Sequence, residues 1–166
     1  MSLPTTTDGY ALGPDDGEAL WFNGALGILK ATGAQTGGRF TAYELRLPEG
    51  FAAPLHAHKN EDEFFLVLSG RIRLQHGDEV IEALPGSLAY TPRGIGHSFR
   101  ADSEDARLLL MFGPAGVEEF FREVATPAQA LTMPPADEPV PDREKLVEIM
   151  TRHEQTLLGP PLPPKD

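Results

Sequence analysis

Four side chains between residues 56 and 97 have the types and spacing of a metal site. His56 and His58 are two residues apart, so on a strand both imidazoles point to the same face. A four-residue turn follows, and Glu63 then opens a strand that can return a carboxylate to that face. His97 begins or lies near a later strand. Three imidazoles and one carboxylate suit a divalent first-row transition metal.

Two other carboxylates compete with Glu63 for the role of ligand. Glu61 and Asp62 precede it directly in the chain. If a strand begins at Glu63, alternation places Glu63, Phe65 and Val67 on one face. We therefore expect Glu63 to be the ligand. A carboxylate beside a metal is also within proton-transfer reach of a substrate hydroxyl, so Glu63 is our candidate general base.

The two remaining histidines are not part of this spaced pattern. A single His-x-His pair is weak evidence, but three of the five histidines fall within this spaced pattern. His76 stands at an expected hairpin tip and His153 on an expected C-terminal helix. We expect neither of them to be a ligand.

The identity of the metal decides what such a site can do. Imidazole suits iron, nickel, copper, cobalt and zinc, and a carboxylate widens the choice to manganese. Four protein ligands on an octahedral ion leave two positions for a substrate and dioxygen. On tetrahedral zinc the same ligands leave none, which would make the site structural. The sequence leaves these metals as alternatives.

Strand-like segments separated by turn residues extend from residue 19 to residue 112. The chain has 166 residues, and its 17 glycines and 16 prolines disfavour a helical bundle. Short strands at close, even spacing are typical of an all-β sandwich or barrel. The expected strands are 26–31, 39–47, 63–68, 71–75, 80–84, 88–91, 96–101 and 107–112.

The hydrophobic period changes after the last of these strands. Apolar residues at 117, 120, 121 and 124 predict an amphipathic helix. Thr126-Pro127 predicts a further short turn of helix. Asp142 is suited to cap a second helix, which we expect to end at Gly159. Its apolar stripe would consist of Leu146, Ile149, Met150, His153 and Leu157, and a polyproline-like tail would follow.

These patterns divide the chain into an arm, a β-barrel and an extension. The arm covers 1–18, the barrel 19–113, and the helical and proline-rich extension 114–166. Sixteen of the 17 glycines lie at or before residue 116, whereas nine of the 16 prolines lie at or after residue 127. The glycines therefore mark the turns of the barrel, and the prolines mainly mark the extension.

Composition excludes several partners. The net charge of −11 repels phosphate groups, so nucleic acid and anionic membranes are poor candidates. The absence of cysteine excludes disulfides and thiol chemistry. No apolar run approaches the 18 residues of a membrane helix, and the first residues lack the pattern of a signal peptide. We expect a cytoplasmic protein that binds a small molecule.

Two segments resemble the two sequence motifs of the cupin superfamily. The motif G-x5-H-x-H-x(3,4)-E-x6-G matches residues 50–70 at every fixed position. The motif G-x5-P-x-G-x2-H-x3-N matches residues 86–101 except at the end, where Ala101 replaces Asn. More broadly, residues 20–125 resemble single-domain cupins related to quercetin 2,3-dioxygenase, for example in the segment from Asp62 to Gly70.

The resemblance implies a fold, a ligand set and an activity. The fold is a double-stranded β-helix, also called a jelly-roll barrel, with C-terminal helices here. The family's metal ligands fall on His56, His58, Glu63 and His97. In the related dioxygenase a flavonol binds the metal through a deprotonated oxygen, dioxygen adds, the heterocycle opens and carbon monoxide leaves. A homodimer is also expected, because cupins of this size commonly dimerise.

Several functions stay open at this point. One is a metal-dependent dioxygenase of an aromatic or enolic, flavonol-like molecule. Another is an isomerase or lyase that acts through a metal-bound enediolate, and a third is a non-catalytic cupin that binds a small molecule. A dry apolar cavity would protect an activated substrate. Alternation gives its candidate wall residues, for which core packing is the competing role: Tyr43, Phe65, Val67, Phe99 and Leu110.

Overall fold

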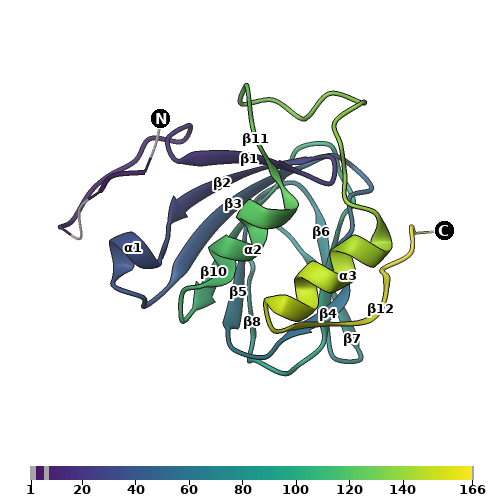
Figure 1. Ribbon diagram of the computed structural model, residues 1–166. Coiled ribbons are helices and arrows are strands. Elements are labelled where there is room, and N and C mark those ends of the chain that lie inside the picture. The colour runs from purple at the N-terminus through teal and green to yellow at the C-terminus, as the bar shows by residue number, and fades with distance from the viewer. Residues whose placement is uncertain (1–2, 6–7, 166) are drawn as a thin grey trace.

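Two antiparallel β-sheets form the body of the protein in a computed structural model that describes residues 3–5 and 8–165 (Figure 1). The larger sheet has the order β11-β1-β2-β3-β10-β5-β8, and the smaller one the order β12-β4-β9-β6-β7. The strands of the larger sheet are β1 (Glu18–Phe22), β2 (Ala25–Ala31), β3 (Thr41–Leu47), β5 (Asp62–Ser69), β8 (Leu88–Thr91), β10 (Ala106–Gly113) and β11 (Thr126–Pro127). Those of the smaller sheet are β4 (Pro54–His58), β6 (Ile72–His76), β7 (Glu79–Ala83), β9 (His97–Ala101) and β12 (Gln155–Pro161).

The hydrophobic core lies between the two sheets, as the alternation within the strands predicts. On β5, Phe65 and Val67 are buried, whereas Phe64 and Leu68 point outward and are each 38% exposed. Leu108 and Leu110 of β10 join the core from the same sheet, and residues of β6 and β9 join it from the other. The all-β fold with strands near the expected positions is therefore confirmed.

Within the described part of the chain, three helices accompany the sheets: α1 (Gly33–Thr36), α2 (Val117–Val124) and α3 (Arg143–Arg152). Figure 1 shows α2 and α3 lying together over one side of the barrel. The apolar face of α2 packs into the core, which confirms the helix predicted for 117–124. At the start of α3, the Asp142 carboxylate accepts a hydrogen bond from the backbone N–H of Lys145 at 2.8 Å, as expected of a capping residue.

Two predictions about the extension were wrong. Thr126-Pro127 forms the short strand β11 beside β1 instead of a helical turn, with Thr126 opposite Trp21. The second helix ends at Arg152, and the chain then forms β12, which pairs with β4. An unpaired edge of β4 exposes backbone donors and acceptors, and pairing with β12 satisfies them more fully than another turn of helix would. The prolines of β12 are tolerated because that strand lies at the end of the sheet.

The extension is therefore not separate from the barrel, since it supplies one strand to each sheet. Within the described residues, no helix is long and apolar enough to cross a bilayer. The part of the 1–18 segment that the structure describes contains no helix and no strand before Glu18.

The packing of Tyr43 in the larger sheet leads to the first testable prediction. The Tyr43 hydroxyl is fully buried without a hydrogen-bond partner, and it lies against the Cα of Gly27. Because burying an unpaired hydroxyl is unfavourable, Tyr43→Phe should raise the free energy of unfolding by about 1 kcal/mol. Gly27→Ala should lower it, because the added Cβ would stand 1.8 Å from the Tyr43 oxygen. Urea unfolding of both variants measures these changes, and destabilisation by Tyr43→Phe would contradict the prediction.

Candidate metal centre

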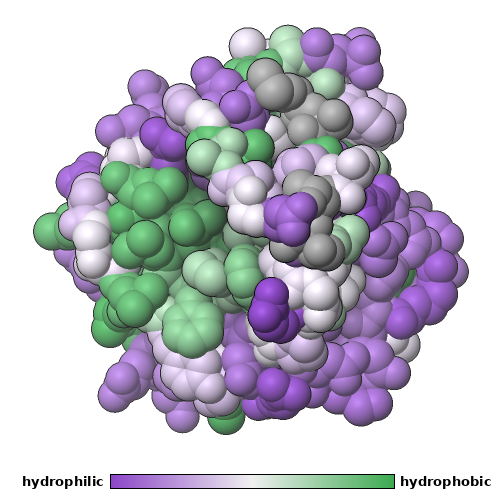
Figure 2. Space-filling model, turned by 90° about the vertical axis from the view of Figure 1, so that its left-hand side faces the viewer, coloured by the Kyte–Doolittle hydropathy of each residue, from purple (hydrophilic) through white to green (hydrophobic). Residues whose placement is uncertain are grey.

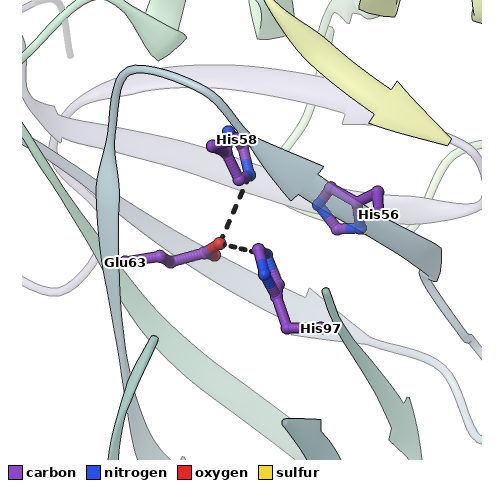
Figure 3. A group of neighbouring side chains, drawn as sticks. All are labelled: His56, His58, Glu63 and His97. Atoms are coloured by element: carbon purple, nitrogen blue, oxygen red, sulfur yellow. Dashed lines mark ion pairs between the residues drawn. The ribbon is translucent and has the colours of Figure 1, made fainter. Parts of the chain in front are cut away.

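Three strands bring the four predicted side chains together (Figure 3). His56 and His58 come from β4, Glu63 from β5 of the opposite sheet, and His97 from β9. His56 and His97 are directly opposite each other in the β4–β9 pair. Each of the four offers one ligand atom, and these atoms all lie within 4.8 Å of one another. The geometry thus gathers groups that are 41 residues apart in the chain.

Backbone carbonyl groups orient two of the imidazole rings. The Nδ1 of His56 lies 2.8 Å from the carbonyl oxygen of Pro54, and the Nδ1 of His97 lies 3.0 Å from that of Ile95. A carbonyl oxygen can only accept, so each Nδ1 carries the hydrogen and donates it. The Nε2 atom of each neutral ring is then left with its lone pair free for a metal.

The ring nitrogens face a carboxylate at a distance that requires a cation. Glu63 Oε2 lies 2.7 Å from His97 Nε2 and 3.4 Å from His58 Nε2. These three atoms are buried and have no hydrogen-bond partner among the described residues. A lone pair that faces a carboxylate oxygen in a buried site is unfavourable unless a proton or a metal ion lies between them. The four residues therefore fit a divalent transition metal.

Burial and neighbouring charges set the protonation of the site. Burial, assisted by the adjacent His97 and His58, lowers the pKa of His56, so this imidazole is neutral near pH 7. Burial alone would raise the pKa of Glu63, but His97 and His58 outweigh it and hold that pKa below its usual range. Burial would lower the pKa of His58, but Glu61 and Glu63 outweigh it and raise that pKa.

The competing carboxylates have other positions. Glu61 is buried behind His58, with its Oε2 3.5 Å from Nδ1, the ring nitrogen facing away from Glu63. Asp62 pairs with Arg93 at 2.9 Å and points away from the cluster. Only Glu63 of the three belongs to the four-residue group, in line with the alternation of β5.

The two other histidines lie outside this group. The Nδ1 of His76 is 3.1 Å from the Thr91 hydroxyl. His153 pairs with Glu123 at 2.7 Å at the end of α3. Neither was expected to be a ligand, and binding of a metal by the other four residues stays a prediction.

A cavity of about 80 Å³ adjoins the cluster, and its lining is mainly apolar. His56, His58 and Glu63 reach it directly. Of the five expected wall residues, Phe99 and Leu110 line it. Tyr43, Phe65 and Val67 are buried in the core but are not part of this lining. Contact of any of these residues with a substrate stays a prediction.

The extension supplies lining residues that were not expected from the sequence. Phe120 and Phe121 come from α2, Leu146 and Met150 from α3, and Gln155 from β12. The apolar stripes of the two helices were visible in the sequence and had to be buried somewhere. Nothing local indicated that they close the space beside the histidines, because that depends on where the helices dock.

The raised pKa of His58 predicts pH-dependent metal binding. A metal binds only the deprotonated ring, so uptake near neutral pH must release a proton from His58. The affinity for Co²⁺ should therefore rise about tenfold per pH unit between pH 6 and 8. Competition with a chromophoric chelator measures this slope. Glu61→Gln removes one of the two carboxylates that raise the pKa, so it should flatten the slope, and an affinity independent of pH would contradict the assignment.

Comparisons with known proteins agree with the fold and the motifs. Residues 43–112 match the sequence profile of the family described as "Cupin domain". The chain is 31% identical over 134 residues to quercetin 2,3-dioxygenase of Bacillus subtilis (strain 168). This alignment covers 81% of the chain but only 40% of that enzyme, so the chain spans about two fifths of its length.

Comparison with solved structures supports the same fold. An RmlC-like cupin from Shewanella frigidimarina superposes with a TM-score of 0.57 at 14% identity, covering 68% of this chain and 96% of that one. Oxalate decarboxylase from Bacillus subtilis superposes with a TM-score of 0.54 at 26% identity, covering 66% and 31% of the two chains. At 14% identity, the similarity to the Shewanella frigidimarina protein shows the fold alone. With the two motifs, the jelly-roll sheets and these relatives in agreement, the chain belongs to the cupin superfamily.

Proposed function

We propose that this protein is a metal-dependent cupin enzyme, and specifically a dioxygenase of a small aromatic or enolic molecule. The observation that carries the proposal is the opening of the His56, His58 and Glu63 side chains into a mainly apolar cavity. A structural metal would not need such a cavity, whereas a catalytic metal needs space for a substrate beside it.

The similarity to a flavonol-cleaving enzyme supports the same reading. The relative named quercetin 2,3-dioxygenase aligns with 81% of this chain, well beyond the segment of the family profile. Because the chain spans 40% of that enzyme, the activity of the whole relative is a proposal here. The cofactor we propose is one divalent ion, with iron, manganese, nickel, cobalt, copper and zinc as candidates.

The chain's own residues have distinct tasks in such a reaction. A bound divalent metal would supply Lewis acidity, which lowers the pKa of a substrate hydroxyl. Glu63 is ionised because its pKa is held low, so its carboxylate can accept the hydroxyl proton. Phe99, Leu110 and Phe112 exclude water from the space in which the deprotonated substrate would lie.

The size of the cavity limits the substrate. A volume of about 80 Å³ holds only a few non-hydrogen atoms, whereas pockets for drug-sized ligands are usually at least about 300 Å³. A whole flavonol exceeds this space, so its binding would require displacement of lining side chains such as Leu146 and Met150 of α3. The structure therefore favours a smaller enol, or a flavonol that binds with α3 displaced.

The same small volume favours a second candidate function. An isomerase or lyase acting on a small acid or sugar through an enediolate would need no more space near the ligands. Similarity to a protein named oxalate decarboxylase, at 26% identity, is compatible with this candidate. Consumption of dioxygen separates the two functions, because only the dioxygenase requires it.

Oxygen uptake tests the proposal. The protein would be loaded with each candidate metal in turn and mixed with flavonols and with smaller enols such as maltol in an oxygen electrode. We expect uptake with at least one pair, and Glu63→Gln should reduce the rate per bound metal by at least about 100-fold. The exposed Glu82→Gln variant is the matched control and should behave as wild type. Turnover of small acids without oxygen uptake would support the second candidate, and binding without turnover would contradict both.

A further inference from the structure

The strand that follows α3 places a polar side chain beside the metal cluster. Gln155 is the first residue of β12, and its Cα lies directly opposite that of His58 on β4. The turn before it is held in place, because the backbone N–H of Lys59 donates to the Glu154 carbonyl at 2.9 Å. Glu154 itself has a φ of 57°, a left-handed conformation that only a well-held turn maintains in a residue other than glycine. The backbone of this turn thus fixes the position of Gln155 beside His58.

The Gln155 side chain is 4% exposed and lines the cavity together with His56, His58 and Glu63. No side-chain hydrogen bond ties its amide to another described residue, and the amide is not among the fully buried atoms without a partner, so its polar atoms keep some accessible surface. Buried amides are almost always hydrogen-bonded, because leaving their donors and acceptor unpaired is unfavourable. Because the amide borders the cavity, a molecule bound there is the hydrogen-bond partner that we expect for it.

Among the described residues, the rest of the buried lining has no similar amide. Apart from the cluster residues, the other buried side chains around the cavity are aliphatic, aromatic or thioether groups, such as Leu45, Phe121 and Met150. Asn23 also borders the cavity, but it is exposed. A substrate that enters meets one buried neutral group able to donate a hydrogen bond.

We propose that Gln155 binds the substrate by donating its amide N–H to a carbonyl or enolate oxygen, next to the oxygen that faces the histidines. This inference rests on the proposed function and extends it to a residue outside the 43–112 family segment. The ligand class is a molecule with two adjacent oxygens, one ionisable and one carbonyl-like. The terminal N–H₂ of the amide provides two donors, which suits an oxygen that carries negative charge.

Maltol is a small probe with this pair of oxygens. It would be titrated into the Co²⁺-loaded protein, and the visible spectrum of the cobalt would report binding. We expect Gln155→Leu to weaken maltol binding about tenfold while the cobalt content is unchanged. Gln155→Glu should weaken it further, because a carboxylate cannot donate and repels an enolate. Thr156→Val, at an exposed position of the same strand, is the control and should bind as wild type.

The outcomes separate this inference from the proposed function. If wild type and Gln155→Leu bind cobalt and maltol equally, the role of Gln155 is wrong and the proposed function stands. If wild type takes up no cobalt, or binds cobalt but no maltol, the proposed function fails and the inference fails with it. Thermal unfolding of the variants verifies that they fold, and the cobalt spectrum without maltol verifies that the ligand geometry is intact.

An independent observation concerns the outer face of the larger sheet. Met111, Phe64 and Tyr90 stand side by side on β10, β5 and β8, and the next row consists of Leu109, Leu66 and Leu88. The rings of Phe64 and Tyr90 lie 4.8 Å apart. Figure 2 shows a broad hydrophobic area on the side of the molecule turned to the viewer. We refer to these six residues and Leu68 as the outer apolar face.

The size and charge of this face fit a second copy of the chain. With Leu88 65% and Tyr90 48% exposed, the face presents apolar surface on the order of 500 Å². Two copies would bury on the order of 1,000 Å², near the minimum for a specific interface. At its ends, Asp62 pairs with Arg93, and Arg107 pairs with Glu44. At these two positions a guanidinium neutralises the carboxylate, which reduces the repulsion expected between copies of a chain with a net charge of −11.

We infer that the homodimer expected from the family resemblance would use the outer apolar face as its contact surface. Analytical ultracentrifugation at 1–100 µM should show a dimer for wild type and a monomer for Leu88→Asp, which places a charge on the most exposed residue of the face. Val80→Asp, at a position of β7 that is 49% exposed, is the matched control and should stay dimeric. A monomeric wild type would overturn the inference and leave the face to a different protein. A dimeric Leu88→Asp variant with normal thermal unfolding would also overturn it.

Discussion

The contact between His97 Nε2 and Glu63 Oε2, at 2.7 Å between two buried atoms, is the constraint on which the rest of this structure depends. Two atoms with lone pairs are unfavourable at that distance unless they share a proton or a metal ion. The contact also requires that β9 and β5 approach from opposite sheets with fixed registers, because a slip of one residue would turn either side chain to the outside. The barrel therefore holds these two side chains together.

The C-terminal extension determines what the cluster can reach. Without α2, α3 and β12, the three residues that open into the cavity would face solvent on that side. The extension instead brings apolar side chains such as Met150 and one buried amide, Gln155. It therefore controls both the size of the space and its polarity, whereas the barrel supplies the ligands. This division explains how one ligand set can serve different substrates in proteins of similar fold.

The sequence predicted those parts of the structure that depend on local patterns. Alternation on β5 identified Glu63 as inward and Glu61 as a weaker candidate, and the pleat of a strand makes that prediction reliable. The amphipathic period identified α2 for a similar reason. The same kind of pattern failed for residues 153–159, where an apolar stripe was compatible with a helix. There the unpaired edge of β4 decided the outcome, and a local pattern contains no information about a distant edge.

By itself, then, the sequence determined the all-β class and the cupin motifs. It also identified the four side chains of the cluster, because residue type and spacing fix which side chains share a face of a strand: His56, His58, Glu63 and His97. Only the tertiary structure decided that Glu61 stands behind His58 and that Gln155 reaches the same cavity. It also decided that Tyr43, Phe65 and Val67 pack in the core and not along the cavity. These outcomes depend on how sheets and helices dock, and docking is determined by the total burial of apolar surface and not by any short segment.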